Sequence, residues 1–122
     1  MTSGARELLR IKLLQNEESV LPLIKEKCLR NSFDIFIENA VIFFIKCKTN
    51  CGEWIMENYS QFRSEYLKSL ICLALGFRGE PELIPFLMER AEFYEWEYPE
   101  ESFERGPALA VEELYYRFIN KK

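Results

Sequence analysis

The chain has 122 residues, enough for one domain with its own core, and its 48% apolar and 30% charged residues exclude a disordered chain. The net charge of −4 is unevenly distributed, because residues 80–113 hold eleven Glu and only two Arg. An acidic segment of this kind repels phosphate groups, which argues against a nucleic-acid partner and favours a protein with a basic surface.

Neither the N-terminus nor the rest of the chain resembles a targeting or membrane segment. The opening residues, MTSGARELLRIK, lack the apolar stretch of a secretory signal. The longest apolar run, residues 40–45, is far shorter than the roughly 20 residues that cross a bilayer. We therefore expect a cytoplasmic protein that does not enter a membrane and whose four Cys are free thiols.

In chain order, apolar periodicity and turn residues predict three pairs of helices and a closing helix. The pairs are expected over residues 5–31, 33–62 and 64–98, and the closing helix over 107–121. Gly106-Pro107 introduces the closing helix, because proline is favoured in the first turn of a helix. All of these helices are expected to form a single domain, residues 1–122.

The first half of the second pair is ambiguous. Residues 35–47 are rich in Ile, Phe and Val and could form a strand, or a hairpin around Glu38-Asn39. A helix is favoured, because the repeat described below requires one at this place.

The third pair has clear helix signals. Between Tyr66 and Leu75, apolar residues recur at the three-to-four spacing of a buried helix. Gly76 and Gly79 follow, and Pro81 stands where the next helix would begin.

The second helix of each pair carries a related sequence. Residues 18–27 align with residues 81–90 at a separation of 63, so that Pro22 matches Pro85 and Ile24 matches Leu87. An intermediate copy, Trp54-Ile-Met-Glu57, aligns with residues 86–89. Three evenly spaced copies indicate a structural repeat of about 31–32 residues.

The segment Leu73-Ala-Leu-Gly-Phe-Arg-Gly-Glu-Pro-Glu-Leu-Ile-Pro-Phe-Leu87 resembles a HEAT-like repeat of the phycobilisome-lyase type. The shared features are an Ala-Leu-Gly helix end, a Gly-acid-Pro turn and an Ile-Pro-x-Leu helix start. The first copy lacks the Gly turn, and the middle copy lacks the proline. The residues that match are Ala74, Leu75, Gly76, Gly79, Glu80, Pro81, Ile84, Pro85 and Leu87.

The resemblance implies an all-α fold, a short right-handed α-α superhelix of about three HEAT-like helix pairs plus a closing C-terminal helix. It also implies an ARM-like curved face that serves as a protein-binding scaffold, although a minority of such proteins are chromophore lyases or bind damaged DNA. The implied function is therefore a non-enzymatic protein-binding scaffold or adaptor.

The cysteines permit two interpretations. Cys28, Cys47, Cys51 and Cys72 could form a zinc site, because Cys47 and Cys51 have the spacing of a ligand pair. However, the four do not form two close pairs, and the chain has no His. Unpaired Cys commonly behaves as a small buried apolar residue, so we expect core packing and no metal or other cofactor.

Catalysis has little support in the sequence. The absence of His removes the commonest general acid–base, and Glu at helical spacing beside Lys and Arg is typical of a solvated face. We predict no catalytic residue.

The alternatives to a protein-binding scaffold are an enzyme or metal-binding module that uses the Cys set or a Glu pair, and a HEAT-like nucleic-acid binder. The latter needs a basic groove, and only Lys25, Lys27 and Arg30 gather.

The segment 93–107 is a candidate binding surface, because it interleaves five aromatic residues with five Glu. Large rings inside a charged rim are typical of a binding hot spot, and the acids favour a basic partner. Alternatively, the rings cap the end of the helix stack. We expect Trp96 and Tyr98 to be exposed and, together with Phe103, to contact a partner.

A second candidate surface follows from the resemblance, because in HEAT-like stacks the second helix of each pair lines the concave side. Methionine adapts to varied partners. The same face could instead form a homodimer, since three pairs barely cover themselves. The predicted contacts on this face are Met56, Met88, Glu57 and Glu89.

Overall fold

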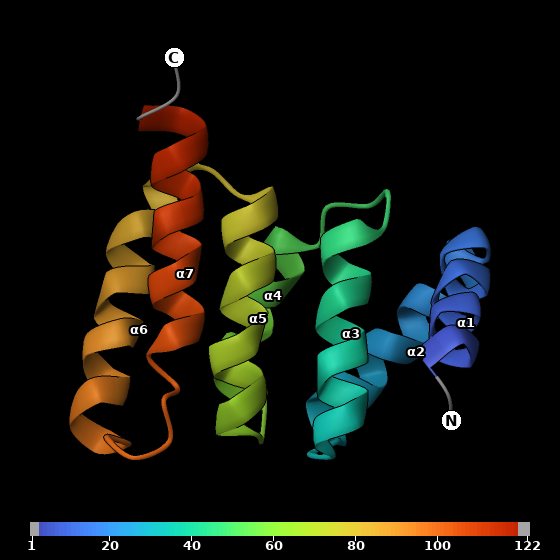
Figure 1. Ribbon diagram of the computed structural model, residues 1–122, viewed down its shortest axis with the longest axis horizontal. Helices are drawn as coiled ribbons and strands as arrows, with labels where there is room; N and C mark the ends of the chain where they lie inside the picture. Colours follow the sequence, from blue (N-terminus) through green and yellow to red (C-terminus); the bar gives the residue numbers. More distant parts are fainter. Residues whose placement is uncertain (1–2, 120–122) are drawn as a thin grey trace.

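The computed structural model describes residues 3–119, without the side chains at positions 3 and 5–7. The regular structure in this range is entirely helical (Figure 1). The α-helices are α1 (Ser3–Gln15), α2 (Glu17–Arg30), α3 (Asp34–Lys46), α4 (Gly52–Asn58), α5 (Glu65–Arg78), α6 (Ile84–Glu97) and α7 (Arg105–Leu114). Short 3-10 turns lie at Tyr59–Gln61 and Pro81–Leu83, and a π-helical turn at Tyr115–Ile119 continues α7.

The all-α class predicted from the sequence is confirmed over the described range, which contains no strand. The helical interpretation of residues 35–47 is also confirmed, since α3 covers nearly all of them. The closing helix begins at Arg105, slightly earlier than predicted. Pro107 is accommodated in its first turn, where the amide that proline lacks would have no helical partner. Residues 120 and 121 of the predicted helix lie outside the described residues.

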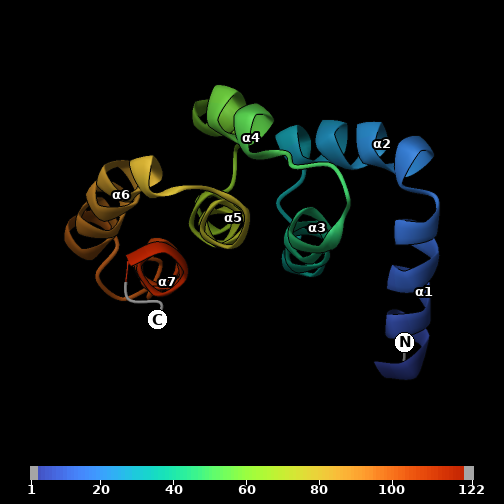
Figure 2. The same ribbon diagram turned by 90° about the horizontal axis from the view of Figure 1, so that it is seen from above.

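The helices form two rows along an arch, as seen from above in Figure 2. Helices α3, α5 and α7 are seen end-on along the inner side, and α2, α4 and α6 follow the outer side. Helix α1 is seen from the side at one end of the arch, turned away from the direction of α3. The second helix of each pair therefore lies on the outer side, and the expectation that it lines the concave side was wrong.

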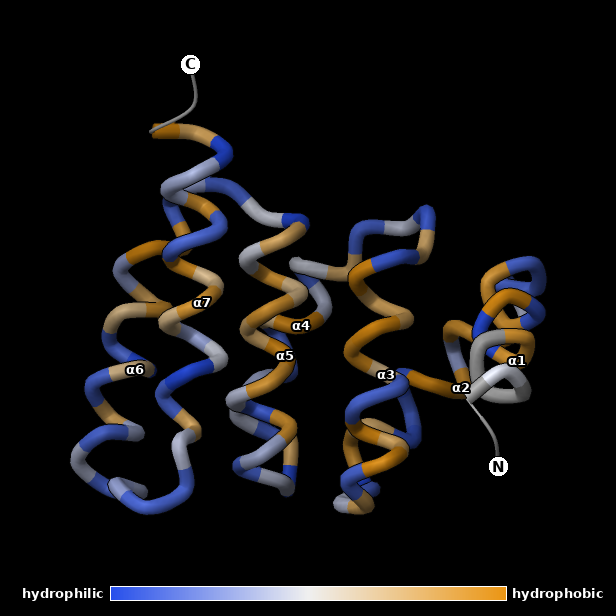
Figure 3. Tube along the Cα trace, viewed as in Figure 1, coloured by the Kyte–Doolittle hydropathy of each residue, from blue (hydrophilic) through white to orange (hydrophobic). Residues whose placement is uncertain are grey.

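The core lies between the two rows. Ile24, Ile55 and Leu87, which share one slot of the sequence repeat, are all buried. Figure 3 shows apolar residues recurring through α3 and α5, whereas the turn between α6 and α7 is hydrophilic. The four cysteines also lie in the core, as expected: Cys28, Cys47, Cys51 and Cys72.

An arginine of α5 secures the C-terminal end of α3. Arg78 Nη1 donates to the carbonyl oxygens of Phe44 (3.1 Å), Ile45 (3.1 Å) and Cys47 (2.6 Å). Its Nη2 donates to the carbonyl oxygen of Lys48 at 3.2 Å. The last carbonyl oxygens of a helix have no hydrogen-bond donor within the helix and carry partial negative charge. A guanidinium supplies both the donors and a positive charge.

The same arrangement occurs one repeat later. Arg117, in the turn after α7, donates from Nη2 to the carbonyl oxygens of Gly76 (2.6 Å) and Gly79 (2.9 Å) at the end of α5. These two carbonyls follow those of Ile45 and Lys48 by 31 residues. Two guanidinium groups thus join consecutive helices of the inner row.

The two arginines are 39 positions apart, whereas the carbonyl groups that they bind are 31 positions apart. The residue that precedes Arg78 by one repeat of 31 positions is Cys47, at the end of α3. Cys47 is buried, and its Sγ lies 3.0 Å from the carbonyl oxygen of Thr49. The sequence repeat therefore relates the bound carbonyl groups and not the arginines that bind them.

Candidate binding groove and acidic surface

Helices α1, α2 and α3 enclose a groove of about 420 Å³. Apolar side chains from all three helices line it, including Leu9 and Leu13 of α1, Ile24 of α2, and Ile35 and Ile42 of α3. The groove is accessible, because the side chain of Ile35 is 62% exposed and that of Leu9 is 47% exposed.

The groove exists because α3 is apolar on more than one face. Ile37, Val41 and Phe44 are buried in the core. Ile35 and Ile42 recur at helical spacing on a different face, which lines the groove. A helix that is apolar on all sides is normally covered on all sides. One face of α3 is therefore only partly covered by its own chain.

The polar side chains that line the groove are Arg10, Asn39 and Lys46. Arg10 donates from Nε and Nη2 to Asn39 Oδ1, at 3.3 and 3.1 Å, and so links α1 to α3. Lys46 is exposed in the last turn of α3. No Asp or Glu is among the described residues that line the groove. Lys46 therefore places an exposed positive charge at one end of the groove.

Sequence reasoning did not find this groove. The sequence feature that indicates the groove is the high apolar content of residues 35–47, which is spread over two faces of the helix. Periodicity alone cannot tell whether a second apolar face will be covered by the same chain. The opening depends on the direction of α1, which the sequence pattern does not reveal.

Helix α6 presents a different, acidic surface. Trp96 lies in its last turn and is 85% exposed, as predicted. The neighbouring carboxylates of Glu92, Glu95 and Glu97 are exposed as well. Tryptophan is seldom exposed to this degree on a protein surface and is enriched in binding hot spots.

Tyr98 and Phe103 are half-buried in an aromatic cluster, so the expectation that Tyr98 is exposed was wrong. The ring centroid of Phe103 lies 5.6 Å from that of Tyr98 and 5.7 Å from that of Tyr94. The turn after α6 folds back onto α5, where Ser69 Oγ donates to the carbonyl oxygen of Phe103 at 2.5 Å. These two rings cover the end of the core, as the capping alternative proposed.

The remaining predicted contacts lie on the outer row. Met56 and Glu57 are exposed on α4, and Met88 and Glu89 are exposed on α6. Helices α4 and α6 both lie on the outer side of the arch in Figure 2. None of the four lines the groove between α1 and α3.

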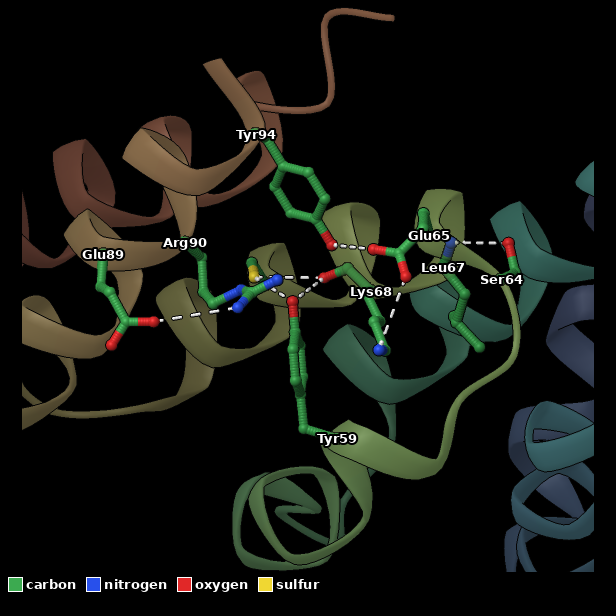
Figure 4. Close-up of polar contacts among 9 residues, drawn as sticks. Tyr59, Ser64, Glu65, Leu67, Lys68, Glu89, Arg90 and Tyr94 are labelled. Atoms are coloured by element: carbon green, nitrogen blue, oxygen red, sulfur yellow. Dashed lines mark hydrogen bonds and ion pairs between the residues drawn. The ribbon is translucent and has the colours of Figure 1, made fainter. Parts of the chain in front are cut away.

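A polar cluster joins α5 and α6 to the turn that follows α4 (Figure 4). The hydroxyl of Tyr59 donates to the carbonyl oxygen of Lys68 at 2.9 Å, and the hydroxyl of Tyr94 donates to Glu65 Oε1 at 3.0 Å. The guanidinium of Arg90 lies 5.4 Å from the ring centroid of Tyr59 and 5.1 Å from that of Tyr94. Such cation–π contacts stabilise partly buried charges.

Burial keeps both hydroxyls of this cluster protonated. It raises the pKa of Tyr94 to about 12 and also raises the pKa of Tyr59. A general acid or base needs a pKa near the working pH. The two tyrosines therefore act as hydrogen-bond donors that hold helices together.

Three of the four cysteines are similarly held in the neutral thiol form. Burial raises the pKa of Cys28 and of Cys72 to about 12, and that of Cys51 to about 11. The thiolate is the nucleophilic and metal-binding form of cysteine. Within residues 3–119, no three or more Cys, Asp or Glu side chains are placed to hold a metal ion together.

In the part of the chain that the structure describes, no helix has the length and apolar character needed to cross a membrane. Comparison of the chain with models of protein families, with curated proteins and with solved structures finds no match. The HEAT-like resemblance therefore stays a prediction, and function has to be argued from the groove and the acidic surface.

Proposed function

We propose that this chain is a non-enzymatic helical-repeat scaffold of the HEAT-like kind that binds another protein through the groove between α1 and α3. The supporting observation is that one apolar face of α3 is open to solvent while the others are covered. The bound segment places apolar side chains in the groove and an acidic one near Lys46.

The composition of the groove supports binding rather than catalysis. Its polar lining consists of Arg10, Asn39 and Lys46. No Cys, Asp or Glu is among the described residues of this lining, so the usual nucleophiles and carboxylate bases are missing from it. The enzyme and metal-binding alternatives depend on the Cys set or a Glu pair, and neither lines the groove in the described residues.

The nucleic-acid alternative is weakened by the small basic cluster on α2. Arg30 of that cluster is paired with Glu26 at 2.7 Å, so part of its charge is already balanced.

We place the protein in the cytoplasm, because buried unpaired thiols suit a reducing compartment.

The acidic surface around Trp96 supports a second contact, to a protein with a basic surface. An exposed indole surrounded by carboxylates fits a partner that offers an apolar pocket with cationic neighbours. The two surfaces are separate, since α1 and α6 lie at opposite ends of the arch (Figure 2).

Ile35→Asp tests the groove, because it adds a carboxylate at an exposed apolar position and leaves the core intact. Leu23→Asp, at a similarly exposed position of α2 outside the groove, is the matched control. A partner is identified by affinity purification, and its binding to the purified chain is then measured by calorimetry. We expect Ile35→Asp to weaken binding by at least about tenfold. Equal affinities for both variants would contradict the proposal.

A further inference from the structure

We infer that Cys47 and Cys51 form a reversible redox site, at which a peroxide converts the two thiols into an intramolecular disulfide bond. Neither cysteine lines the groove between α1 and α3. The inference goes beyond the proposed function and does not rest on it, because the site lies in the turn between α3 and α4.

The two thiols of this turn converge on one backbone atom. Cys47 is the C-cap residue of α3, and Cys51 is the N-cap residue of α4. The Sγ atom of Cys47 lies 3.0 Å from the carbonyl oxygen of Thr49, and the Sγ atom of Cys51 lies 3.7 Å from the same oxygen. Two sulfur atoms that contact a single oxygen need only a small rearrangement of the turn to bond.

Groups other than the thiols hold the turn in this shape. The carboxylate of Glu17, in the first turn of α2, accepts hydrogen bonds from the backbone N–H groups of Lys48 at 2.6 Å and Thr49 at 2.9 Å. From α5, Arg78 Nη1 donates to the carbonyl oxygen of Cys47 at 2.6 Å. A turn that is fixed from two sides keeps the two thiols at a high effective concentration.

The pair lies directly beneath the surface. Cys47 and Cys51 are both 3% exposed, whereas the residues between them, 48–50, are exposed. Cys28 and Cys72 lie within α2 and α5 and are fully buried. Opening of the turn alone therefore brings the first pair to solvent, whereas exposure of the other two requires helices to separate.

The surroundings of Cys51 explain why the closed turn protects the pair. Burial, and next the neighbouring Cys47 thiol, raise the pKa of Cys51 to about 11, while Lys25 and Arg78 act in the opposite direction. The thiolate is the nucleophilic form of cysteine. When the turn opens, the burial that keeps the thiol protonated is lost, so thiolate forms and reacts.

The oxidation balances with a peroxide as the only co-reactant. The thiolate of one cysteine attacks an oxygen of hydrogen peroxide, the O–O bond breaks, and a sulfenic acid and hydroxide form. The hydroxide takes up the proton that the thiol released. The second thiol then attacks the sulfenic sulfur, the S–S bond forms, and the sulfenic oxygen leaves as water with the second thiol proton. Two thiols thus lose two electrons and two protons, and one peroxide becomes two waters.

Oxidation of the pair acts on the joint between α3 and α5. Arg78 donates to the carbonyl oxygens of Cys47 and Lys48, and Asn50 Nδ2 donates to the carbonyl oxygen of Arg78 at 3.1 Å. A disulfide removes both S–H donors from the carbonyl oxygen of Thr49 and connects the two ends of the turn covalently. The redox state of the pair therefore changes the turn to which Arg78 binds.

Peroxide treatment of the folded, reduced full chain tests the inference. Remaining thiols are blocked with N-ethylmaleimide, and unreduced tryptic peptides are analysed by mass spectrometry. Trypsin cleaves after Lys46 and Lys48, so the disulfide should join the dipeptide Cys47-Lys48 to the peptide 49–63. We expect this disulfide to exceed every other pairing at least about tenfold and to disappear after treatment with dithiothreitol.

Single replacements separate the two steps of the reaction. In Cys47→Ser and Cys51→Ser the second step has no thiol, so the remaining cysteine should stop at the sulfenic acid, which dimedone traps. Cys28→Ala is the matched control, because it also removes one buried cysteine and should form the disulfide as the wild type does. Circular dichroism establishes that each variant is folded.

Three results would overturn the inference in the folded wild type. These are a Cys47–Cys51 pair that stays reduced until urea is added, another disulfide that forms to the same extent, and sulfinic acid at either cysteine in place of the disulfide. In the wild type, Cys28 and Cys72 serve as internal controls, since both should be recovered as thiols that react with the blocking reagent only in urea.

Discussion

At the scale of single residues, two arginines determine how the inner row of helices is joined. Arg78 reaches four carbonyl oxygens at the end of α3, and Arg117 reaches two at the end of α5. A guanidinium offers five donors in a fixed plane and can serve several carbonyls at once. A lysine in its place has a single ammonium, which cannot reproduce this geometry.

Replacement of Arg78 should therefore destabilise the fold. We expect Arg78→Ala to lower the free energy of unfolding by about 2–3 kcal/mol, because several carbonyls lose a charged donor. Arg78→Lys should lose less, since one or two of these bonds can be kept. The measurement is urea denaturation followed by circular dichroism. Arg63→Ala, at an exposed arginine, is the control, and a loss at Arg78 no larger than at Arg63 would refute the role.

The buried thiols give a second prediction at this scale. Since burial raises the pKa of Cys28 and Cys72 to about 12, both thiols stay almost entirely protonated at pH 8. In the folded protein these cysteines should react with a disulfide reagent many-fold more slowly than in urea. Rapid labelling of either cysteine in the native state, located by mass spectrometry, would contradict the burial.

At the scale of elements, α7 approaches α5 closely because glycines stand at the contact. A Cβ atom on Gly76 would lie 2.5 Å from Ala110 Cα, and one on Gly106 would lie 2.0 Å from the carbonyl oxygen of Ser69. Both distances are shorter than non-bonded atoms tolerate, so side chains there would push the helices apart.

The same substitution should have opposite effects at two glycines. Gly106→Ala should lower the free energy of unfolding by roughly 2–3 kcal/mol, because the backbone of α5 must move. Gly4→Ala, where no atom lies within 4 Å of the added carbon, should stabilise the protein by up to about 1 kcal/mol through helix propensity. Thermal unfolding compares the two, and equal effects would contradict the close packing.

At the scale of the whole molecule, the stack is one-dimensional, so each helix is stabilised mainly by its neighbours. Helix α5 lies between α3 and α7 in the inner row, whereas α1 stands at the end of the arch (Figure 2). Arg10 of α1 binds the side chain of Asn39 on α3, whereas Arg78 of α5 binds four backbone carbonyl oxygens at the end of α3. Stability should therefore decrease from α5 towards α1.

Hydrogen exchange should reveal this gradient. We expect backbone amides of α5 to exchange at least about 100-fold more slowly than those of α1, because α1 can open without unfolding the rest. Peptide-level mass spectrometry at low protein concentration measures both. Equal protection of α1 and α5 would show that the molecule opens as a single unit. Occupation of the groove should raise the protection of α1 selectively.

The sequence by itself determined the helical class and the positions of most helices. Local signals suffice for these features: apolar residues at three-to-four spacing, and the Gly and Pro residues around Pro81 that end one helix and begin the next. The sequence repeat also aligns Ile24, Ile55 and Leu87 with one another, and all three are buried. Each of these features depends on residues within a few turns of one another.

Only the tertiary structure shows which row of helices faces inward, that other rings cover Tyr98, and where a groove stays open between helices. Periodicity shows that a helix has an apolar face, but the neighbour that covers the face is chosen by distant residues. Arg78 acts on carbonyls about 30 positions away, and Ser69 fixes the turn at Phe103 from a similar distance. The groove beside Ile35 lies where α1, at the end of the arch, turns away from the direction of α3.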